Sequence, residues 1–215
     1  MVKIGRKVKI KENVDIEQRG MTGFIVDDYG NREFPIVVEI GKKRLHFKED
    51  ELEFLKLRVY LAGPFFNERQ IKLAKKVEAA LEMNETIDSF FSPRLHQDDP
   101  TLEMFTPAWA KVTMENDVKE IEKADIVLAI VDFDEEKYEG DLAYYEARDT
   151  DSGTAWELGY AIAKGMPTFL VHFKNEGMVN IMLTERNTAF FNDEKQIEKY
   201  NFIEQNKIPF TGDYR

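Results

Sequence analysis

Short runs that alternate apolar and polar positions fill the first 56 residues, a pattern typical of strands in a small antiparallel sheet. The runs RKVKI, TGFIVDD, FPIVVEI and KRLHF are separated by turn residues, among them Gly20, Gly30 and Gly41. Four or five short strands in this span predict a small SH3-like β-barrel domain over residues 1–56. The charged segment KEDELEFLK then leads into the rest of the chain.

From Leu57 onward the pattern changes to alternating strands and helices. Apolar runs typical of buried strands are LRVYLAG, TIDSFFSP, DIVLAIVDF and MPTFLVHF. Between them lie three segments with apolar residues near the helical period: NERQIKLAKKVEAALE, PAWAKVTMENDVKEIEKA and DSGTAWELGYAIAKG, the last ending at Gly165. This order predicts a second domain over residues 57–215, an α/β domain whose parallel sheet has helices on both faces.

The loops at the carboxyl ends of such strands are where an α/β sheet binds its ligand. They begin at Gly63-Pro64, at Ser92-Pro93-Arg94, at Asp132 and at Phe173. The segment 132–151 holds nine acidic residues. We expect most of it to be a solvated acidic loop, although a long loop at this edge could also act as a lid.

Charge and composition narrow the classes of function. The net charge is −11, and it lies in the second domain, because residues 1–56 hold 12 Lys and Arg against 11 Asp and Glu. A broad nucleic-acid footprint there is not expected. The chain has no cysteine and only three histidines without ligand spacing, so neither a metal site nor a cofactor is predicted. Without an export signal or an apolar run near 18 residues, we expect a cytoplasmic protein with no membrane contact.

Candidate chemistry concentrates on carboxylates. AGPFFNERQ has one glycine and neither dinucleotide nor triphosphate-binding spacing, and GTAWELG is not a serine nucleophile elbow. Asp151 and Glu157 can approach each other if Asp151 folds back over the helix start, which Gly153 would permit. Thr154 and Glu157 also fit a capping box, so Glu157 could be a cap or a nucleophile. A pair of carboxylates is the equipment for cleaving a glycosidic bond with retention.

The segments VYLAGPFF, FFSPR, ENDVKEIEKADIVLAIVD and DTDSGTAWELGYAIAKGMPTFLV, in this order, resemble the nucleoside 2-deoxyribosyltransferase family. The resemblance covers about residues 57–215 and implies a flavodoxin-like, Rossmann-like fold. It implies transfer of 2-deoxyribose between nucleobases through a covalent glycosyl-enzyme, as in nucleoside salvage. It also implies a homo-oligomer, built on dimers and possibly a hexamer, in which one subunit completes the site of another.

The same resemblance assigns roles to individual residues. Glu157 falls on the nucleophile, Asp151 on the acid that protonates the departing base, and Tyr60 on the tyrosine that orients the nucleophile. The substrate-binding positions are Asp117 and Phe65 at the base, the two glycines Gly63 and Gly153, and Asn180 and Met182, which would reach a neighbouring subunit's site. If Glu157 lies at the start of its helix, the partial positive charge there would keep its carboxylate ionised.

Two other functions remain open. A hydrolase of nucleosides or nucleoside 5′-monophosphates would pass the sugar to water, but the first loop offers only Arg69 to a phosphate. A non-catalytic nucleoside-binding or scaffold module would depend on the first 56 residues instead.

Overall fold

The computed structural model describes residues 7–96, 101–103, 106–148, 150–173 and 178–214, and it divides the chain into two compact units, Met1–Lys56 and Leu57–Arg215. The first unit is one antiparallel sheet with the strand order β4-β3-β2-β1-β5. Its strands are β1 (Lys7–Ile10), β2 (Thr22–Asp28), β3 (Ile36–Ile40), β4 (Lys43–Phe47) and β5 (Leu52–Phe54). Ile10, Ile25 and Val38 form the centre of its core. The SH3-like character of this unit stays a prediction.

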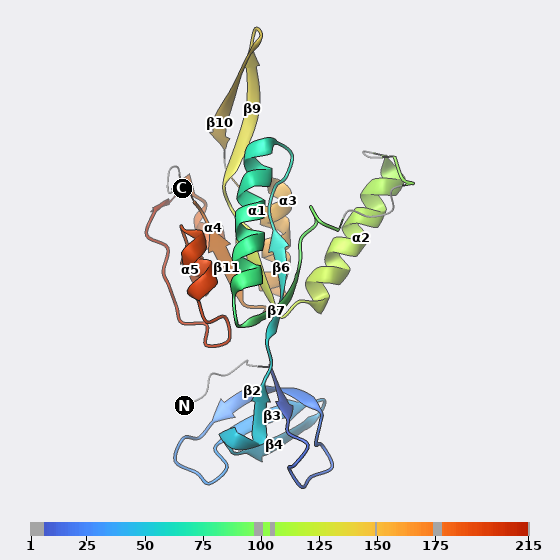
Figure 1. Cartoon of the computed structure of the whole chain (residues 1–215), viewed down its shortest axis with the longest axis vertical. Coiled ribbons are helices and arrows are strands. Elements are labelled where there is room, and N and C mark those ends of the chain that lie inside the picture. The colour runs from blue at the N-terminus through green and yellow to red at the C-terminus, as the bar shows by residue number, and fades with distance from the viewer. Residues whose placement is uncertain (1–6, 97–100, 104–105, 149, 174–177, 215) are drawn as a thin grey trace. The chain divides into compact units, whose positions relative to one another are not determined.

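The second unit is built on a five-stranded parallel sheet with the order β13-β11-β8-β6-β7 (Figure 1). Its strands are β6 (Leu57–Ala62), β7 (Ile87–Phe91), β8 (Ile126–Ile130), β11 (Thr168–Val171) and β13 (Ala189–Phe191). Numbered along the chain, the order is 2-1-3-4-5, that of flavodoxin-like folds. The predicted α/β class is therefore confirmed for this unit.

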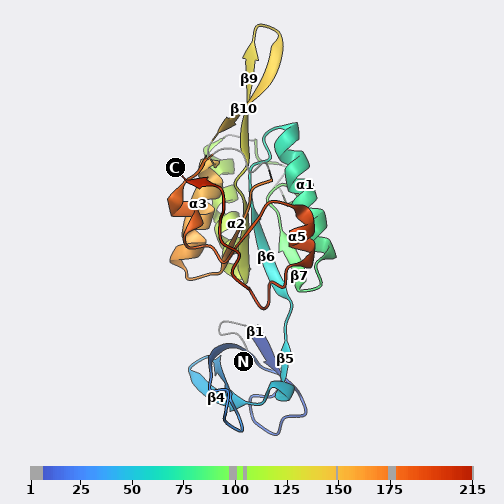
Figure 2. The ribbon, with the colours of Figure 1, turned by 90° about the vertical axis from the view of Figure 1, so that its left-hand side faces the viewer.

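Helices cover both faces of the parallel sheet (Figure 2). On one face, Val59 and Leu61 of β6 share a core with α1 (Glu68–Met83) and α5 (Glu194–Lys199). On the other, Tyr60 and Ala62 share a core with α2 (Pro107–Lys123) and α3 (Ser152–Ala163). Alternate residues of one strand thus serve opposite cores, as the two-residue repeat of a strand requires. Strand order reverses between β6 and β8, so the crevice at their carboxyl ends is the expected ligand site.

The acidic segment after β8 is a β-hairpin, not the solvated loop that its charge suggested. It consists of β9 (Phe133–Glu139) and β10 (Leu142–Arg148), paired antiparallel across the turn at Gly140-Asp141. Gly140 adopts a φ of 61°, a conformation that glycine takes without steric cost and that a two-residue hairpin turn needs. The hairpin extends from the carboxyl end of the sheet in Figures 1 and 2. The high count of acids obscured this turn signal in the sequence.

Short elements complete the second unit: β12 (Met178–Val179), α4 (Ile181–Thr184) and β14 (Asp213–Tyr214). β12 and β14 pair in parallel, which fixes the C-terminal segment beside α4. Within the ranges described, none of the helices has the length and apolar character to cross a membrane.

Candidate active site

Tyr60 lies near the carboxyl end of β6, on the face that packs against α2 and α3. The residue is fully buried, at 0% exposure. Its partner in the sheet register is Phe91 of β7, and the two rings stack with centroids 5.6 Å apart. Packing therefore fixes the ring and leaves the hydroxyl as its one polar group to be satisfied.

Asp151 is the N-cap of α3. Its carboxylate accepts a hydrogen bond from the Thr154 backbone N–H at 2.9 Å and another from the Thr154 hydroxyl at 3.2 Å. A Cβ at Gly153 would lie 3.0 Å from the Asp151 carboxylate, so glycine leaves room for this fold-back. The capping box expected from Thr154 and Glu157 is wrong, because the helix begins at Ser152 and Asp151 supplies the cap.

Glu157 consequently lies in the second turn of α3, where it faces β6. The Tyr60 hydroxyl donates a hydrogen bond of 2.5 Å to its carboxylate. This contact joins residues 97 positions apart in the sequence and connects the central strand to the helix that follows the hairpin. It also holds the carboxylate beside β6, one of the two strands between which the strand order reverses.

The electrostatic surroundings of Glu157 favour its protonated form. Burial raises the pKa of its carboxyl from 4.5 to about 8, and the negative charges of Asp117 and Asp151 add to the effect, against the opposing hydrogen bond from Tyr60. The expected ionisation by a helix N-terminus is therefore wrong, since Glu157 lies beyond the first turn, to which that effect is confined. Burial, Glu157 and Asp117 together hold the pKa of Tyr60 far above its usual range.

Three carboxyl groups from separate places in the chain thus influence one another: Asp117 on α2, Asp151 at the cap of α3, and Glu157 within α3. The negative charges of the two aspartates act on Glu157 in the same direction as burial and favour its protonated form. Such a cluster can supply both an anionic nucleophile and a proton donor.

Of the remaining expected site residues, Gly63 and Phe65 lie in the loop after β6, and Asn180 and Met182 lie at the start of α4. Gly63 follows β6, and a Cβ there would lie 3.1 Å from the side chain of Ile130, so glycine lets the loop pass close to β8. Phe65 is half-buried and stacks on Phe66. Asn180 caps α4 by accepting the Met182 N–H at 2.9 Å. A cavity of about 260 Å³ is lined by Thr150, Ala155, Asn180, Met182 and Leu183.

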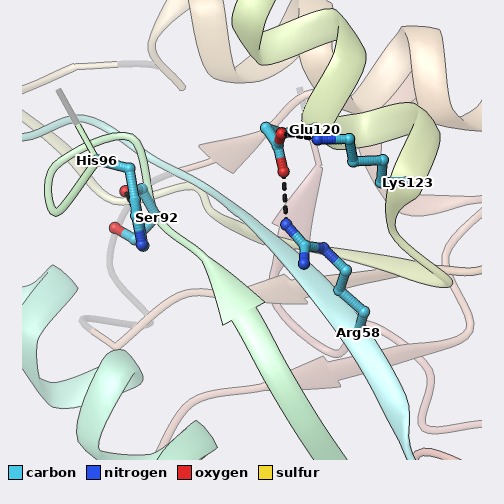
Figure 3. A network of polar contacts seen from close by, with 5 residues as sticks. All are labelled: Arg58, Ser92, His96, Glu120 and Lys123. Carbon is cyan, nitrogen blue, oxygen red and sulfur yellow. Dashed lines mark hydrogen bonds and ion pairs between the residues drawn. The ribbon is translucent and has the colours of Figure 1, made fainter. Parts of the chain in front are cut away.

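Two ionic clusters escaped the sequence analysis. Glu78, an acid on the buried stripe of α1, accepts hydrogen bonds from the Ser92 hydroxyl at 2.8 Å and from Arg94 Nε at 3.0 Å. Glu120 of α2 accepts from Arg58 and Lys123, each at 2.5 Å (Figure 3). The one signal in the sequence for the first cluster was Glu78, an acid at an apolar helix position, together with the FFSPR segment that holds Ser92 and Arg94. The second lies near the start of β6 and ties α2 to the sheet.

Comparison with known proteins points to one family. The family model described as nucleoside 2-deoxyribosyltransferase matches residues 59–205. A nucleoside deoxyribosyltransferase of Limosilactobacillus fermentum is 26% identical over 166 residues, which cover 71% of this chain and 90% of that protein. One from Lactobacillus leichmannii is 31% identical over 124 residues, covering 54% and 70%. The solved 2-deoxyribosyltransferase of Bacillus psychrosaccharolyticus is 32% identical, with a TM-score of 0.55 over 72% of this chain and 99% of that one.

The raised pKa of Glu157 predicts how Glu157→Gln changes stability. Between 4.5 and about 8, the folded protein keeps a proton that the unfolded chain loses, so this group's contribution to stability falls as pH rises through that window. Glutamine cannot ionise. We therefore expect the free energy of unfolding of Glu157→Gln, relative to wild type, to rise with pH up to about 8.

Urea denaturation of the two proteins across this pH range measures the difference. Glu82→Gln, at an exposed position of α1, is the matched control and should show no such trend. A constant difference between Glu157→Gln and wild type at all pH values would contradict the buried, protonated state of Glu157.

Proposed function

Because the chain belongs to the nucleoside 2-deoxyribosyltransferase family, we propose that it moves 2-deoxyribose from a deoxynucleoside to a free nucleobase, with Glu157 as the nucleophile. The observation that carries this proposal is the 2.5 Å hydrogen bond from Tyr60 to Glu157 beside two further carboxyl groups. The unit from Leu57 to Arg215 would be the catalytic domain.

The proposed reaction has two half-reactions at the sugar carbon C1′. In the first, the Glu157 carboxylate forms a bond to C1′ as the bond to the base nitrogen breaks, and the base takes a proton from Asp151. In the second, a nitrogen of the incoming base attacks C1′, returns a proton to Asp151 and releases Glu157. Two displacements on one carbon give retention of configuration.

Because the pKa of Glu157 is raised, its carboxyl holds the proton that the departing base needs. At neutral pH most free enzyme carries a proton on Glu157, because the pKa is about 8. The nucleophile must lose that proton before it attacks, and the departing base must gain one. We propose that substrate binding moves the proton within the cluster to Asp151, so that one shared proton serves both requirements.

The other residues would bind the substrate. Asp117 would hold the base by hydrogen bonds and Phe65 would pack on its face. Asn180 and Met182 would complete the site of a neighbouring subunit in a homo-oligomer. The 78% exposure of Met182 supports this, since a large apolar side chain on a short exposed helix suits a surface that another subunit covers.

Glu157→Gln tests the proposed function directly. Wild-type protein incubated with a deoxynucleoside and a different free base should form the new nucleoside, and its intact mass should rise by one deoxyribosyl group. Glu157→Gln should lose turnover by roughly 10³-fold or more and show no such adduct, because an amide cannot act as the anionic nucleophile.

Glu82→Gln should behave as wild type in the same assays. Release of free sugar at an unchanged rate, with or without the acceptor base, would assign the protein to the nucleoside hydrolases. Near-normal transfer by Glu157→Gln would contradict the nucleophile assignment.

Asp151→Asn tests the direction of proton flow. We expect this variant to slow transfer from ordinary deoxynucleosides by roughly 10²-fold or more, the scale of a lost general acid. The loss should be much smaller for a deoxyribosyl donor with an activated nitrophenyl-type leaving group, which departs without a proton. Rates on both donors come from stopped-flow or chromatographic assays. Equal losses on the two donors would show that Asp151 only positions the base.

A further inference from the structure

The loop after β7 is held in a defined position by buried charge. Glu78 of α1 is only 5% exposed and receives hydrogen bonds from the Ser92 hydroxyl and from two nitrogens of the Arg94 guanidinium. A two-point contact between guanidinium and carboxylate fixes geometry as well as charge. The segment that follows Arg94 at this edge of the sheet is therefore anchored at its start.

His96 lies on this loop and ends a row of stacked rings. Its imidazole stacks on Phe91 with centroids 4.8 Å apart, and Phe91 stacks on Tyr60, whose hydroxyl binds Glu157. Figure 3 shows Ser92 and His96 together on the loop that follows β7. The ring of His96 is thus anchored at the carboxyl edge of the sheet, with the ring of Phe91 between it and Tyr60, the partner of Glu157.

The hydrogen bond of His96 to the backbone selects one tautomer. Nδ1 lies 3.0 Å from the Ser92 carbonyl oxygen. A carbonyl oxygen only accepts hydrogen bonds, so Nδ1 carries the proton. In the neutral ring, Nε2 is then a hydrogen-bond acceptor, and it belongs to an exposed side chain. A ligand that reaches Nε2 of the neutral ring therefore meets a hydrogen-bond acceptor, which suits an N–H donor and repels a carbonyl oxygen.

We propose that His96 recognises the nucleobase: its Nε2 accepts a hydrogen bond from an exocyclic amino group. The site then prefers adenine and cytosine over hypoxanthine and uracil, their counterparts with a carbonyl oxygen at the same position. This inference rests on the proposed function, because it takes a nucleobase as the ligand. His96 contributes specificity and no chemistry, so its removal changes the choice of base more than the rate of the chemical step.

His96→Phe is the variant that tests this role, because phenylalanine keeps the stacking on Phe91 and removes the nitrogen. Transfer from deoxyadenosine against deoxyinosine, and from deoxycytidine against deoxyuridine, gives two ratios of kcat/KM. We expect both ratios to fall by roughly threefold to tenfold in His96→Phe, the effect of one lost hydrogen bond. His96→Gln, whose amide oxygen can accept, should recover part of the preference. Unchanged ratios in His96→Phe would overturn the proposal.

Nitrogen-15 NMR of the histidine rings gives a readout that needs no turnover. The chain has three histidines, and His96→Phe identifies the signals of His96. Adenine and cytosine should shift the Nε2 signal of His96 while Nδ1 stays protonated, and hypoxanthine and uracil should not. A shift of the Nε2 signal without any transfer activity would contradict the proposed transferase function and support recognition of the base by His96. Transfer activity with no shift of the His96 signals, or with the proton on Nε2, would contradict recognition of the base by His96 and leave the transferase function supported.

Discussion

The hydrogen bond from Tyr60 to Glu157 is the contact on which the site depends. It needs a strand that places Tyr60 on the α2 and α3 face, a parallel partner that stacks Phe91 on the ring, and a helix that presents its second turn to the strand. Each of these features follows from the doubly covered sheet. A buried tyrosine hydroxyl needs a hydrogen-bond partner, and the carboxylate of Glu157 accepts from it.

Burial decides the charge of Glu157. The first turn of a helix stabilises an anion by typically 0.3–1 kcal/mol, which is less than one pKa unit. The shift from 4.5 to about 8 is larger and has the opposite sign. Its cause is the enclosure of the carboxyl together with the charges of Asp117 and Asp151. Burial therefore keeps Glu157 mostly protonated at neutral pH, and the charges of Asp117 and Asp151 act in the same direction.

Much of the fold of the second unit could be predicted from the sequence, because strands and helices there carry clear periods of two and 3.6 residues. The start of α3 could not, since Asp151 and Thr154 are both good caps by residue type, and only the structure shows that Asp151 is the one used. The β9–β10 hairpin was not predicted, because the many acidic residues of this segment favoured a solvated loop over a strand pair with a turn at Gly140. The roles of Tyr60 and Glu157 came from resemblance to a family, and the Glu78–Arg94 contact joins side chains that no sequence period relates.

The pH dependence of sugar transfer to the protein, in wild type and in Tyr60→Phe, tests the account most directly. An activated deoxyribosyl donor has no base that draws the proton to Asp151. With this donor, the rate of adduct formation should rise with pH to a midpoint near 8 in wild type, as Glu157 loses its proton. Tyr60→Phe removes the hydrogen bond that lowers this pKa, so its midpoint should lie at higher pH. A wild-type midpoint near 4.5, or the same midpoint in both proteins, would contradict the claim that burial and Tyr60 together set the ionisation of Glu157.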